Sequence, residues 1–208
     1  PAPLDPREPE NIAKSIRLLK LKHAVITSVD RDDVEDLGAA HWVKVIQAIK
    51  RENPATTMEV LIPDFQGRAE LVKQVIAAAP EVISHNLETV RRLSDRVRSR
   101  AKYETSLQVI RQIAEAGIVS KSGIMLGLGE TRDEILETMD DLRAVGCRVM
   151  TIGQYLQPTA RNIEVVEYIR PEVFEEYRTI GLSKGFDHVE SGPLVRSSYH
   201  AERHVKRD

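Results

Sequence analysis

The sequence contains a single cysteine, Cys147, and no long apolar run. One cysteine excludes a framework of disulfides within the chain, on which many small secreted proteins depend. A membrane-spanning helix needs about twenty mostly apolar residues in succession, and the sequence has neither such a run nor a signal peptide. We therefore expect a protein of a reducing, cytoplasmic compartment that does not act at a membrane.

Excess charge of either sign is also small. The formal net charge is -2, although 30% of the residues are charged and 41% are hydrophobic. This balance argues against disorder and gives no basic signal for nucleic acid as a partner. The 208 residues suit one domain with a real core. Because the chain begins at Pro1 without a methionine, we expect that an amino-terminal part is absent from it.

Short β-branched runs alternate with amphipathic stretches, and no internal repeat interrupts them. The pattern predicts strands at 23–30, 58–64, 82–86, 119–126, 149–156 and 188–191. It predicts helices at 39–51, 69–79, 87–93, 103–116, 133–145 and 171–184. Gly117 and Gly146 follow two of these helices, where glycine is a frequent stop residue.

Strands that alternate with helices of this length pair in parallel through right-handed crossovers. The result is an open doubly wound sheet or a complete or partial βα barrel, and barrels place their chemistry at the carboxyl ends of the strands. Polar residues stand at those ends here: Ser28, Asp30, Asp64, His85, Asn86, Gln154, Tyr155 and Gln157. The fold class that this favours is α/β, a partial TIM-like barrel of parallel strands in one domain, 1–208. In it, 188–208 form a tail that covers the barrel mouth. The strands are too few for an eight-stranded closure, so we expect at least one more before Pro1.

Two polar loops each have a functional and a structural interpretation. The acidic loop 30–36 can hold magnesium, accept a ligand amine or favour the start of a helix, and a plain solvated loop explains it equally well. In the segment 85–88, Asn86 and Glu88 have groups that bind sugar hydroxyls, but the segment is also suited to capping the next helix.

Three other features are weaker signals. The glycine-rich turn 123–131 lacks the spacing of a dinucleotide or P-loop motif, and Thr131 with Glu134 forms a capping box there. The basic residues from Arg91 to Lys102 form either a solvated face or a site for an anionic partner. Cys147 is expected to be a small buried side chain and not a nucleophile.

Five segments together resemble the lipoyl synthase family of radical S-adenosylmethionine enzymes. They are TSVDRDDVEDLGA from Thr27, SHNLETV from Ser84, KSGIMLGLGET from Lys121, TIGQYLQPT from Thr151 and GPLVRSSYHA from Gly192. The resemblance runs through nearly the whole chain, and the opening PLDPREP is similar to the segment that follows the family's radical-SAM cysteine motif. It implies a partial barrel with six parallel strands in the intact family and with the first strand absent here.

The resemblance also implies a reaction. A 5′-deoxyadenosyl radical abstracts hydrogen from C6 and C8 of an octanoyl chain on a lysine of a lipoyl carrier domain, and sulfur is inserted at both carbons. Two 4Fe-4S clusters are implied, one that cleaves S-adenosylmethionine and an auxiliary one that donates sulfur. The implied partners are the glycine cleavage H protein or the E2 subunits of 2-oxoacid dehydrogenases, together with a reducing electron donor.

Residue roles follow from the same resemblance. Asn86 and Glu88 match the pair that holds the ribose of S-adenosylmethionine. Arg98 is matched to its carboxylate, with Arg100 as a rival. Other matches surround the methionine and adenine parts of the cofactor: Ser28, Asp30, Gly127 and Gly129.

In the tail, the family uses one serine of its RSSY motif as the fourth ligand of the auxiliary cluster. Ser198 is our first candidate for this ligand and Ser197 the second. The neighbours that would position it are Arg196, Tyr199 and His200. The alternative is a segment that only covers the barrel.

The sequence departs from the family in one large respect. The two cysteine triads that hold the clusters, CxxxCxxC and CxxxxCxxxxxC, are absent, and Cys147 does not replace them. We therefore expect this chain alone to be inactive. Two other classes stay open: an aldolase-like βα-barrel enzyme with Lys121 as its Schiff-base lysine, and a non-catalytic module that binds a carrier protein through the arginine patch.

Overall fold

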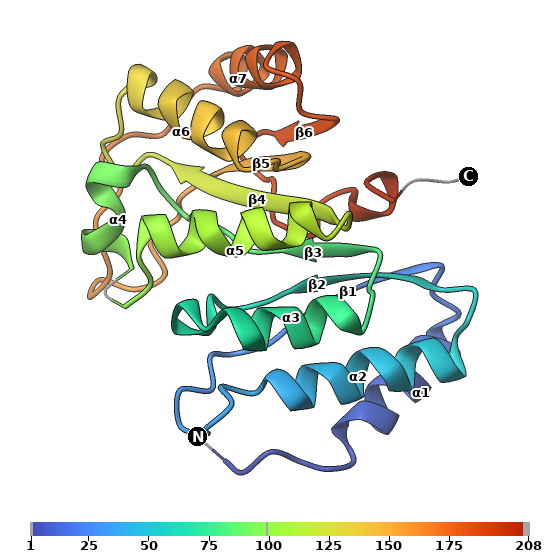
Figure 1. Ribbon diagram of the computed structural model, residues 1–208. Helices are drawn as coiled ribbons and strands as arrows, with labels where there is room; N and C mark the ends of the chain where they lie inside the picture. Colours follow the sequence, from blue (N-terminus) through green and yellow to red (C-terminus); the bar gives the residue numbers. More distant parts are fainter. Residues whose placement is uncertain (1, 99, 206–208) are drawn as a thin grey trace.

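Six parallel strands form one sheet in the computed structural model, which describes residues 2–98 and 100–205 (Figure 1). The strands are β1 His23–Thr27, β2 Thr57–Leu61, β3 Val82–Ser84, β4 Val119–Leu126, β5 Val149–Gln154 and β6 His188–Ser191. The helices are α1 Glu8–Leu19, α2 Ala39–Glu52, α3 Ala69–Ala77, α4 Arg91–Val97, α5 Tyr103–Glu115, α6 Arg132–Ala144 and α7 Pro171–Ser183. Among these, no helix is long and apolar enough to cross a bilayer.

The strand order decides between the two predicted topologies. The order β1-β2-β3-β4-β5-β6 follows the chain, whereas a doubly wound sheet reverses its strand order and carries helices on both faces. Here α2, α3, α5 and α6 lie on one side of the sheet (Figure 1). The predicted partial barrel is therefore confirmed. The family resemblance predicted six strands in the intact family and the first of them absent here, which would leave five. The described residues form six strands by themselves. A further strand before Pro1 stays a prediction.

Alternate residues of the strands face the two sides of this sheet. Met58 and Val60 of β2 point outward and pack with α2 and α3, while Ile124 and Ile152 pack against the helices of the second half. The inner face carries the other set, in which polar side chains are frequent. This alternation leaves the concave side free for a ligand and for the tail.

The tail runs along the inner face of the sheet. Lys121 Nζ of β4 donates a hydrogen bond to the carbonyl oxygen of Ser197. Farther along, Val205 packs against Val82, Val119 and Val149, which stand at or near the amino ends of their strands. The tail thus passes from the carboxyl ends of the strands to their amino ends inside the barrel. That it also covers the mouth stays a prediction.

The structure differs from the predicted elements at two places. The helix predicted at 87–93 is wrong, because Glu88 forms a parallel bridge with Ile124 of β4 and α4 begins only at Arg91. Helix α1 was not predicted. Its amphipathic face, which buries Ala13 and Ile16, follows a proline-rich opening that hid the helical period.

Candidate functional site

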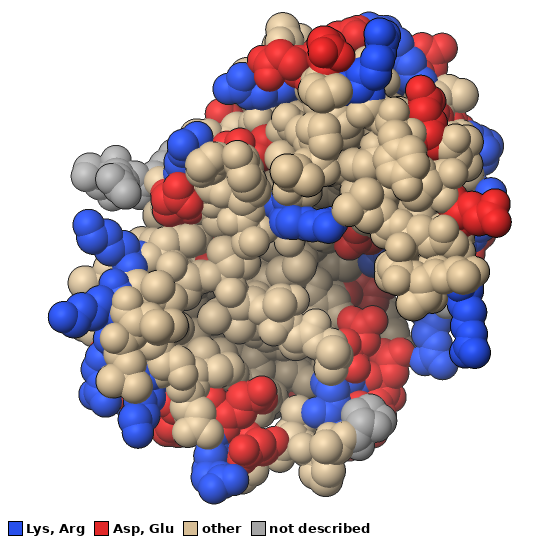
Figure 2. All heavy atoms as spheres, turned by 180° about the vertical axis from the view of Figure 1, so that it is seen from behind, with Lys and Arg blue, Asp and Glu red and all other residues tan. Residues whose placement is uncertain are grey.

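A cavity of about 140 Å³ lies where the carboxyl ends of β3, β4 and β5 meet the tail. Figure 2 shows the molecule from behind, and this face is hollowed along its middle, with acidic side chains at one margin of the hollow. The residues that line the cavity are Asn86, Glu88, Gly123, Ile124, Met125, Thr151, Gly153, Gln154, Val195, Arg196 and Ser197. The structure therefore brings together Asn86, Glu88, Gln154, Arg196 and Ser197 from the sequence-based set. Sequence reasoning gave no site role to Gly123, which opens the glycine-rich turn, or to Thr151, and the feature that joins them is their inward register on adjacent strands.

Glu88 is held in a strained backbone conformation beside this cavity. Its φ is 65°, in the left-handed region that side chains other than glycine rarely adopt. The strain is maintained because its N–H donates to Gly123 O at 3.0 Å and its carbonyl accepts from Met125 N at 2.9 Å. Strain of this kind concentrates at ligand-binding sites. The parallel bridge to β4 holds the Glu88 backbone in this conformation and so fixes the direction of its side chain, which lines the cavity.

Asn86 presents an unpaired acceptor to the same cavity. Its Oδ1 is buried and has no hydrogen-bond partner among the described residues. A Cβ at Gly123 would lie 3.2 Å from this oxygen and 2.3 Å from Thr151 Oγ1, so only glycine leaves the space open. Burial raises the pKa of Glu88, against the opposing effects of Asn86 and Arg98. An amide oxygen and a carboxylate that both lack full pairing suit a ligand with hydroxyl donors.

A chain of hydrogen bonds fixes Arg98 from behind. Arg98 Nη1 donates to Ser106 Oγ at 2.9 Å, and Ser106 Oγ lies 2.9 Å from His85 Nε2. His85 Nδ1 lies 2.9 Å from Ile62 O. A carbonyl oxygen only accepts, so His85 carries its proton on Nδ1 and accepts from Ser106 at Nε2. The chain orients the guanidinium of Arg98. Burial lowers the pKa of Arg98, and the charges of Glu88, Asp64 and Asp30, in that order, oppose this effect.

Acid should destabilise the fold through His85. Burial lowers the pKa of His85 to about 4 from an ordinary value of 6.5. The unfolded chain therefore takes up a proton below pH 6.5 while the native chain does not, so stability is complete above pH 6.5 and falls between 6.5 and 4. Between pH 7.5 and pH 5 the loss at this residue is about 2 kcal/mol.

Urea unfolding at these two pH values measures the effect. His85→Gln is expected to lose this part of the pH dependence and to be less stable at pH 7.5, since it also loses one hydrogen bond. Equal pH dependence in both proteins would contradict the assignment. His188→Gln is the matched control, because His188 is only half-buried.

Asp30 does not line the cavity of Asn86 and Glu88. It lines a neighbouring cavity of about 370 Å³ with Asp32, Asp64 and Arg100. Burial, then Asp32 and Asp64, raise the pKa of Asp30, whereas Arg98 lowers it. Arg100 pairs with Asp32 at 2.8 Å, which leaves Arg98 as the better candidate for a ligand carboxylate.

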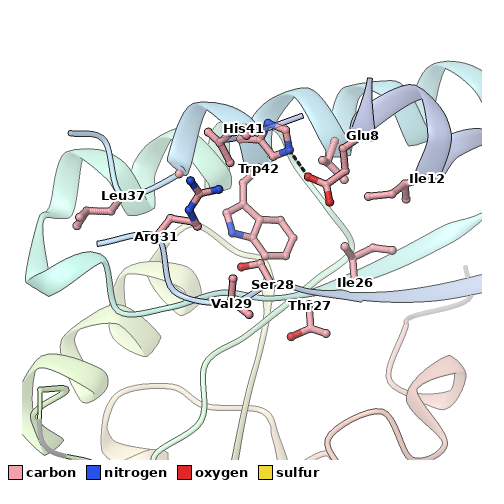
Figure 3. A pocket seen from close by; sticks show the side chains of 13 residues that line it. Glu8, Ile12, Ile26, Thr27, Ser28, Val29, Arg31, Leu37, His41 and Trp42 are labelled. Atoms are coloured by element: carbon pink, nitrogen blue, oxygen red, sulfur yellow. Dashed lines mark hydrogen bonds and ion pairs between the residues drawn. The ribbon is translucent and has the colours of Figure 1, made fainter. Parts of the chain in front are cut away.

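Ser28 is placed elsewhere. It lines a mostly apolar cavity of about 320 Å³ between α1, α2 and β1, beside Trp42 and Ile26 (Figure 3). At its rim His41 Nε2 lies 2.6 Å from Glu8 Oε2. The structure does not bring Ser28 to the cavity of Asn86, so its role at the methionine amino group stays a prediction without geometric support.

The glycine-rich turn is occupied by contacts within the chain. The N–H groups of Gly127 and Leu128 donate to the Glu130 carboxylate at 2.6 and 2.9 Å. A Cβ at Gly127 would lie 2.4 Å from Glu167 O, so this glycine permits a close approach of the following loop. Thr131 and Glu134 form the predicted capping box. Gly127 thus has a structural explanation, and contact of Gly127 and Gly129 with the cofactor stays a prediction.

The predicted basic patch is largely neutralised by ion pairs. Arg92 pairs with Glu134, and Lys102 pairs with Asp95 at 2.6 Å. Arg91 pairs with both Glu104 and Asp141. Ion pairs of this kind favour the solvated face, and the alternative of a site for an anionic partner or a carboxylate substrate stays a prediction.

The acidic loop also serves the fold. Asp36 accepts from Gly38 N at 3.0 Å and from Ala40 N at 2.9 Å, at the start of α2. This is the predicted effect on a helix start. In residues 2–98 and 100–205, no group of three or more potential ligands among His, Cys, Asp and Glu could hold a metal ion.

Cys147 is a buried structural side chain, as predicted. Its Sγ donates to Val149 O at 3.3 Å, and burial raises the pKa of the thiol to about 12. That a tail serine ligates a cluster stays a prediction. Ser198 is exposed and Ser197 half-buried, and neither hydroxyl has a hydrogen-bond partner within the part of the chain that is described.

Comparison with known proteins identifies the family. A family model of the Radical SAM superfamily matches residues 1–142. The lipoyl synthase of Treponema denticola is 72% identical over 205 residues, which make up 99% of this chain and 71% of that protein. The chain belongs to the lipoyl synthase family. The lipoyl synthase of Parabacteroides distasonis is 67% identical over 99% of this chain and 73% of its own length.

A solved structure agrees with the partial-barrel fold. Methylornithine synthase superposes with a TM-score of 0.68 at 12% identity, over 93% of this chain and 64% of that one. Such a low identity supports the fold alone. Membership of the Radical SAM superfamily implies a 4Fe-4S cluster and S-adenosylmethionine for the lipoyl synthase family. The resemblance carried by the five segments is confirmed.

Proposed function

We propose that this chain forms the S-adenosylmethionine-binding barrel of an enzyme that inserts two sulfur atoms at C6 and C8 of a protein-bound octanoyl group. One observation carries the proposal: Asn86, whose Oδ1 has no hydrogen-bond partner among the described residues, and Glu88, whose backbone is strained, line the same cavity, which Gly123 keeps open. Ribose hydroxyls donate to such oxygens, and the family resemblance matches the same two residues to the ribose. Arg98, fixed by Ser106, would bind the carboxylate of the cofactor.

In this proposal the chain's own residues bind S-adenosylmethionine and orient it. When bound, S-adenosylmethionine and a cluster supply the radical chemistry that attacks unactivated C–H bonds, and the protein directs it. Asn86 and Glu88 would hold the ribose against β4, and the tail, which lines one side of the cavity, would shield the ligand from water. None of the described side chains fits the cysteine ligation of either cluster, because the one thiol is buried and protonated.

The auxiliary cluster enters the proposal only through the tail. Ser198, or Ser197 in its place, would supply an oxygen ligand, which matches iron more weakly than thiolate. The two clusters need cysteines that this chain lacks, so the chain alone is proposed to be inactive. Octanoylated lipoyl carrier domains, of the glycine cleavage H protein or of E2 subunits, are proposed as substrates, and a cytoplasmic electron donor as reductant.

The aldolase-like alternative is not supported. Lys121 is buried and burial lowers its pKa, as a Schiff-base lysine requires. However, its amine already bonds to Glu59 and to the carbonyl of Ser197, and its side chain is 0% exposed, so a carbonyl substrate does not reach it.

The ribose contact is tested with Asn86→Ala in the cluster-loaded enzyme, by which we mean this chain joined to the residues that carry the family's two cysteine triads, with both clusters reconstituted. We expect the KM for S-adenosylmethionine to rise about tenfold to a hundredfold, since one or two hydrogen bonds to a buried ligand are lost. Glu88→Gln should weaken binding less, because the amide keeps an acceptor. Asn11→Ala, at an exposed position of α1, is the matched control. An unchanged KM in Asn86→Ala would remove this residue from the site.

A further inference from the structure

A hydroxyl on β5 faces the cavity of Asn86 from the opposite side. Thr151 is in register with Gly123 of β4, and β4 lies between β3 and β5 in the sheet (Figure 1). The Thr151 residue is 4% exposed, lines the cavity and makes no side-chain hydrogen bond to any other described residue. A buried hydroxyl without a partner costs free energy, so its retention at this position calls for a ligand group that pairs with it.

The Thr151 hydroxyl and the Asn86 amide oxygen border the same space above Gly123. A Cβ at Gly123 would lie 2.3 Å from Thr151 Oγ1 and 3.2 Å from Asn86 Oδ1. A ligand atom seated slightly above that point therefore lies within hydrogen-bonding distance of both oxygens. Asn86 Oδ1 is itself buried and unpaired among the described residues. The absence of a side chain at Gly123 thus leaves a polar slot between two unpaired oxygens.

The two oxygens of this slot differ in what they can bond. Asn86 Oδ1 only accepts, whereas the Thr151 hydroxyl can donate as well as accept. A ligand hydroxyl satisfies both, because it donates to Asn86 Oδ1 and accepts from Thr151. A carbonyl or carboxylate has no proton for Asn86, and an ammonium group has no lone pair for Thr151. The slot is therefore built for an alcohol hydroxyl.

A second hydroxyl has its acceptor next to the slot. Glu88 lines the same cavity, and Asn86 opposes the raised pKa of its carboxyl through a side-chain hydrogen bond. This contact turns the amide N–H of Asn86 toward Glu88 and its Oδ1 toward Gly123. Two acceptors in succession, with a donor opposite the first, match the adjacent hydroxyls of a vicinal diol.

We propose that Thr151 is a specificity-determining residue: with Asn86 it brackets one ribose hydroxyl above Gly123, so that the site favours a ribose over a deoxyribose. The inference rests on the proposed function, from which the ribose is taken. A site built around a hydroxyl rejects an analogue that lacks it, because the buried groups that would pair with that hydroxyl stay unpaired.

Thr151→Val should weaken the ligand site without destabilising the fold. Valine has nearly the same shape as threonine, and the hydroxyl that it replaces has no partner among the described residues. We therefore expect the free energy of unfolding of the ligand-free chain to stay unchanged or to rise, as measured by urea denaturation. A clear loss of stability would show that the hydroxyl serves the fold and would overturn the assignment.

Binding is measured on this chain without iron, with S-adenosylhomocysteine as the probe and amide NMR as the readout. This probe carries the same ribose as S-adenosylmethionine. Thr151→Val is expected to raise its dissociation constant about tenfold, as the loss of one buried hydrogen bond predicts. Thr151→Ser keeps the hydroxyl and should keep most of the affinity. Thr179→Val, at an exposed position of α7, is the matched control.

Deoxy analogues of the probe show whether Thr151 contacts a hydroxyl directly. The 2′-deoxy and 3′-deoxy forms each lack one hydroxyl of the diol. With one of them Thr151→Val should cost no further affinity, because the partner of Thr151 is already missing, and with the other the tenfold loss should remain. An equal loss with both analogues would mean that Thr151 acts only through the shape of the site, contrary to the inference.

The outcomes separate this inference from the proposed function. If Asn86→Ala weakens binding of the probe and Thr151→Val does not, water alone pairs with Thr151, and the inference fails while the proposed ribose site stands. If the unsubstituted chain shows no saturable shift with the probe, or if Asn86→Ala binds it equally well, the proposed ribose site fails and the inference fails with it.

Discussion

Lys121→Met alone is expected to lower the free energy of unfolding by about 3–5 kcal/mol, because it leaves the Glu59 carboxylate buried without its partner. The site offers no compensation: Glu59 Oε1 already lacks a hydrogen-bond partner within the described residues, and the pair is closed to water. The release of the tail adds to the loss. Urea denaturation of the single variant measures it.

Two further proteins make this prediction specific. The Lys121→Met/Glu59→Met variant should recover most of the stability, because no isolated charge remains in the barrel. Lys102→Met removes an exposed lysine that pairs with Asp95 at 2.6 Å, and it should cost no more than about 1 kcal/mol. A single variant as stable as the double one would mean that Glu59 is protonated at little cost when Lys121 is absent.

The sequence pattern predicted helices and strands best where start or stop residues mark the ends of the element. Strand β4 was predicted at 119–126 and has these bounds, since it begins after the helix stop at Gly117 and ends at the turn of Gly127. The start of α6 was predicted to within one residue by its capping box. Both signals act within a few residues, so a sequence reveals them without the fold.

Contacts between distant strands explain what the sequence did not reveal. Residues 87–90 have apolar and charged side chains at helical spacing, but pairing of Glu88 with β4 overrides that preference. The Lys121–Glu59 pair likewise depends on the register of β2, β3 and β4 and on the curvature of the sheet. Its sequence signal was a single charged residue inside each of the two strands, which is rare enough in buried strands to indicate an internal partner.

The candidate site was predicted in part for the same reason. Position at a strand end indicated Asn86 and Glu88, and the family resemblance gave them a role. The neighbours that complete the cavity, such as Gly123 and Thr151, lie on adjacent strands and share no local motif. Ser28 shows the converse, since it follows a strand as predicted but faces a different cavity.

Ser198→Ala in the cluster-loaded enzyme is expected to abolish lipoyl formation, by at least a hundredfold, while cleavage of S-adenosylmethionine continues. The two activities separate because Ser198 is exposed outside the set of residues that line the Asn86 cavity. Simultaneous assays of 5′-deoxyadenosine and of the lipoylated carrier measure this ratio.

Ser197→Ala decides which hydroxyl is the ligand. Ser197 lines the Asn86 cavity and its carbonyl is held by Lys121, so its side chain is constrained on the side of the tail that faces this cavity. Its loss should change the KM for S-adenosylmethionine more than the yield of lipoyl groups. If instead Ser197→Ala abolishes lipoyl formation and Ser198→Ala does not, the ligand is Ser197.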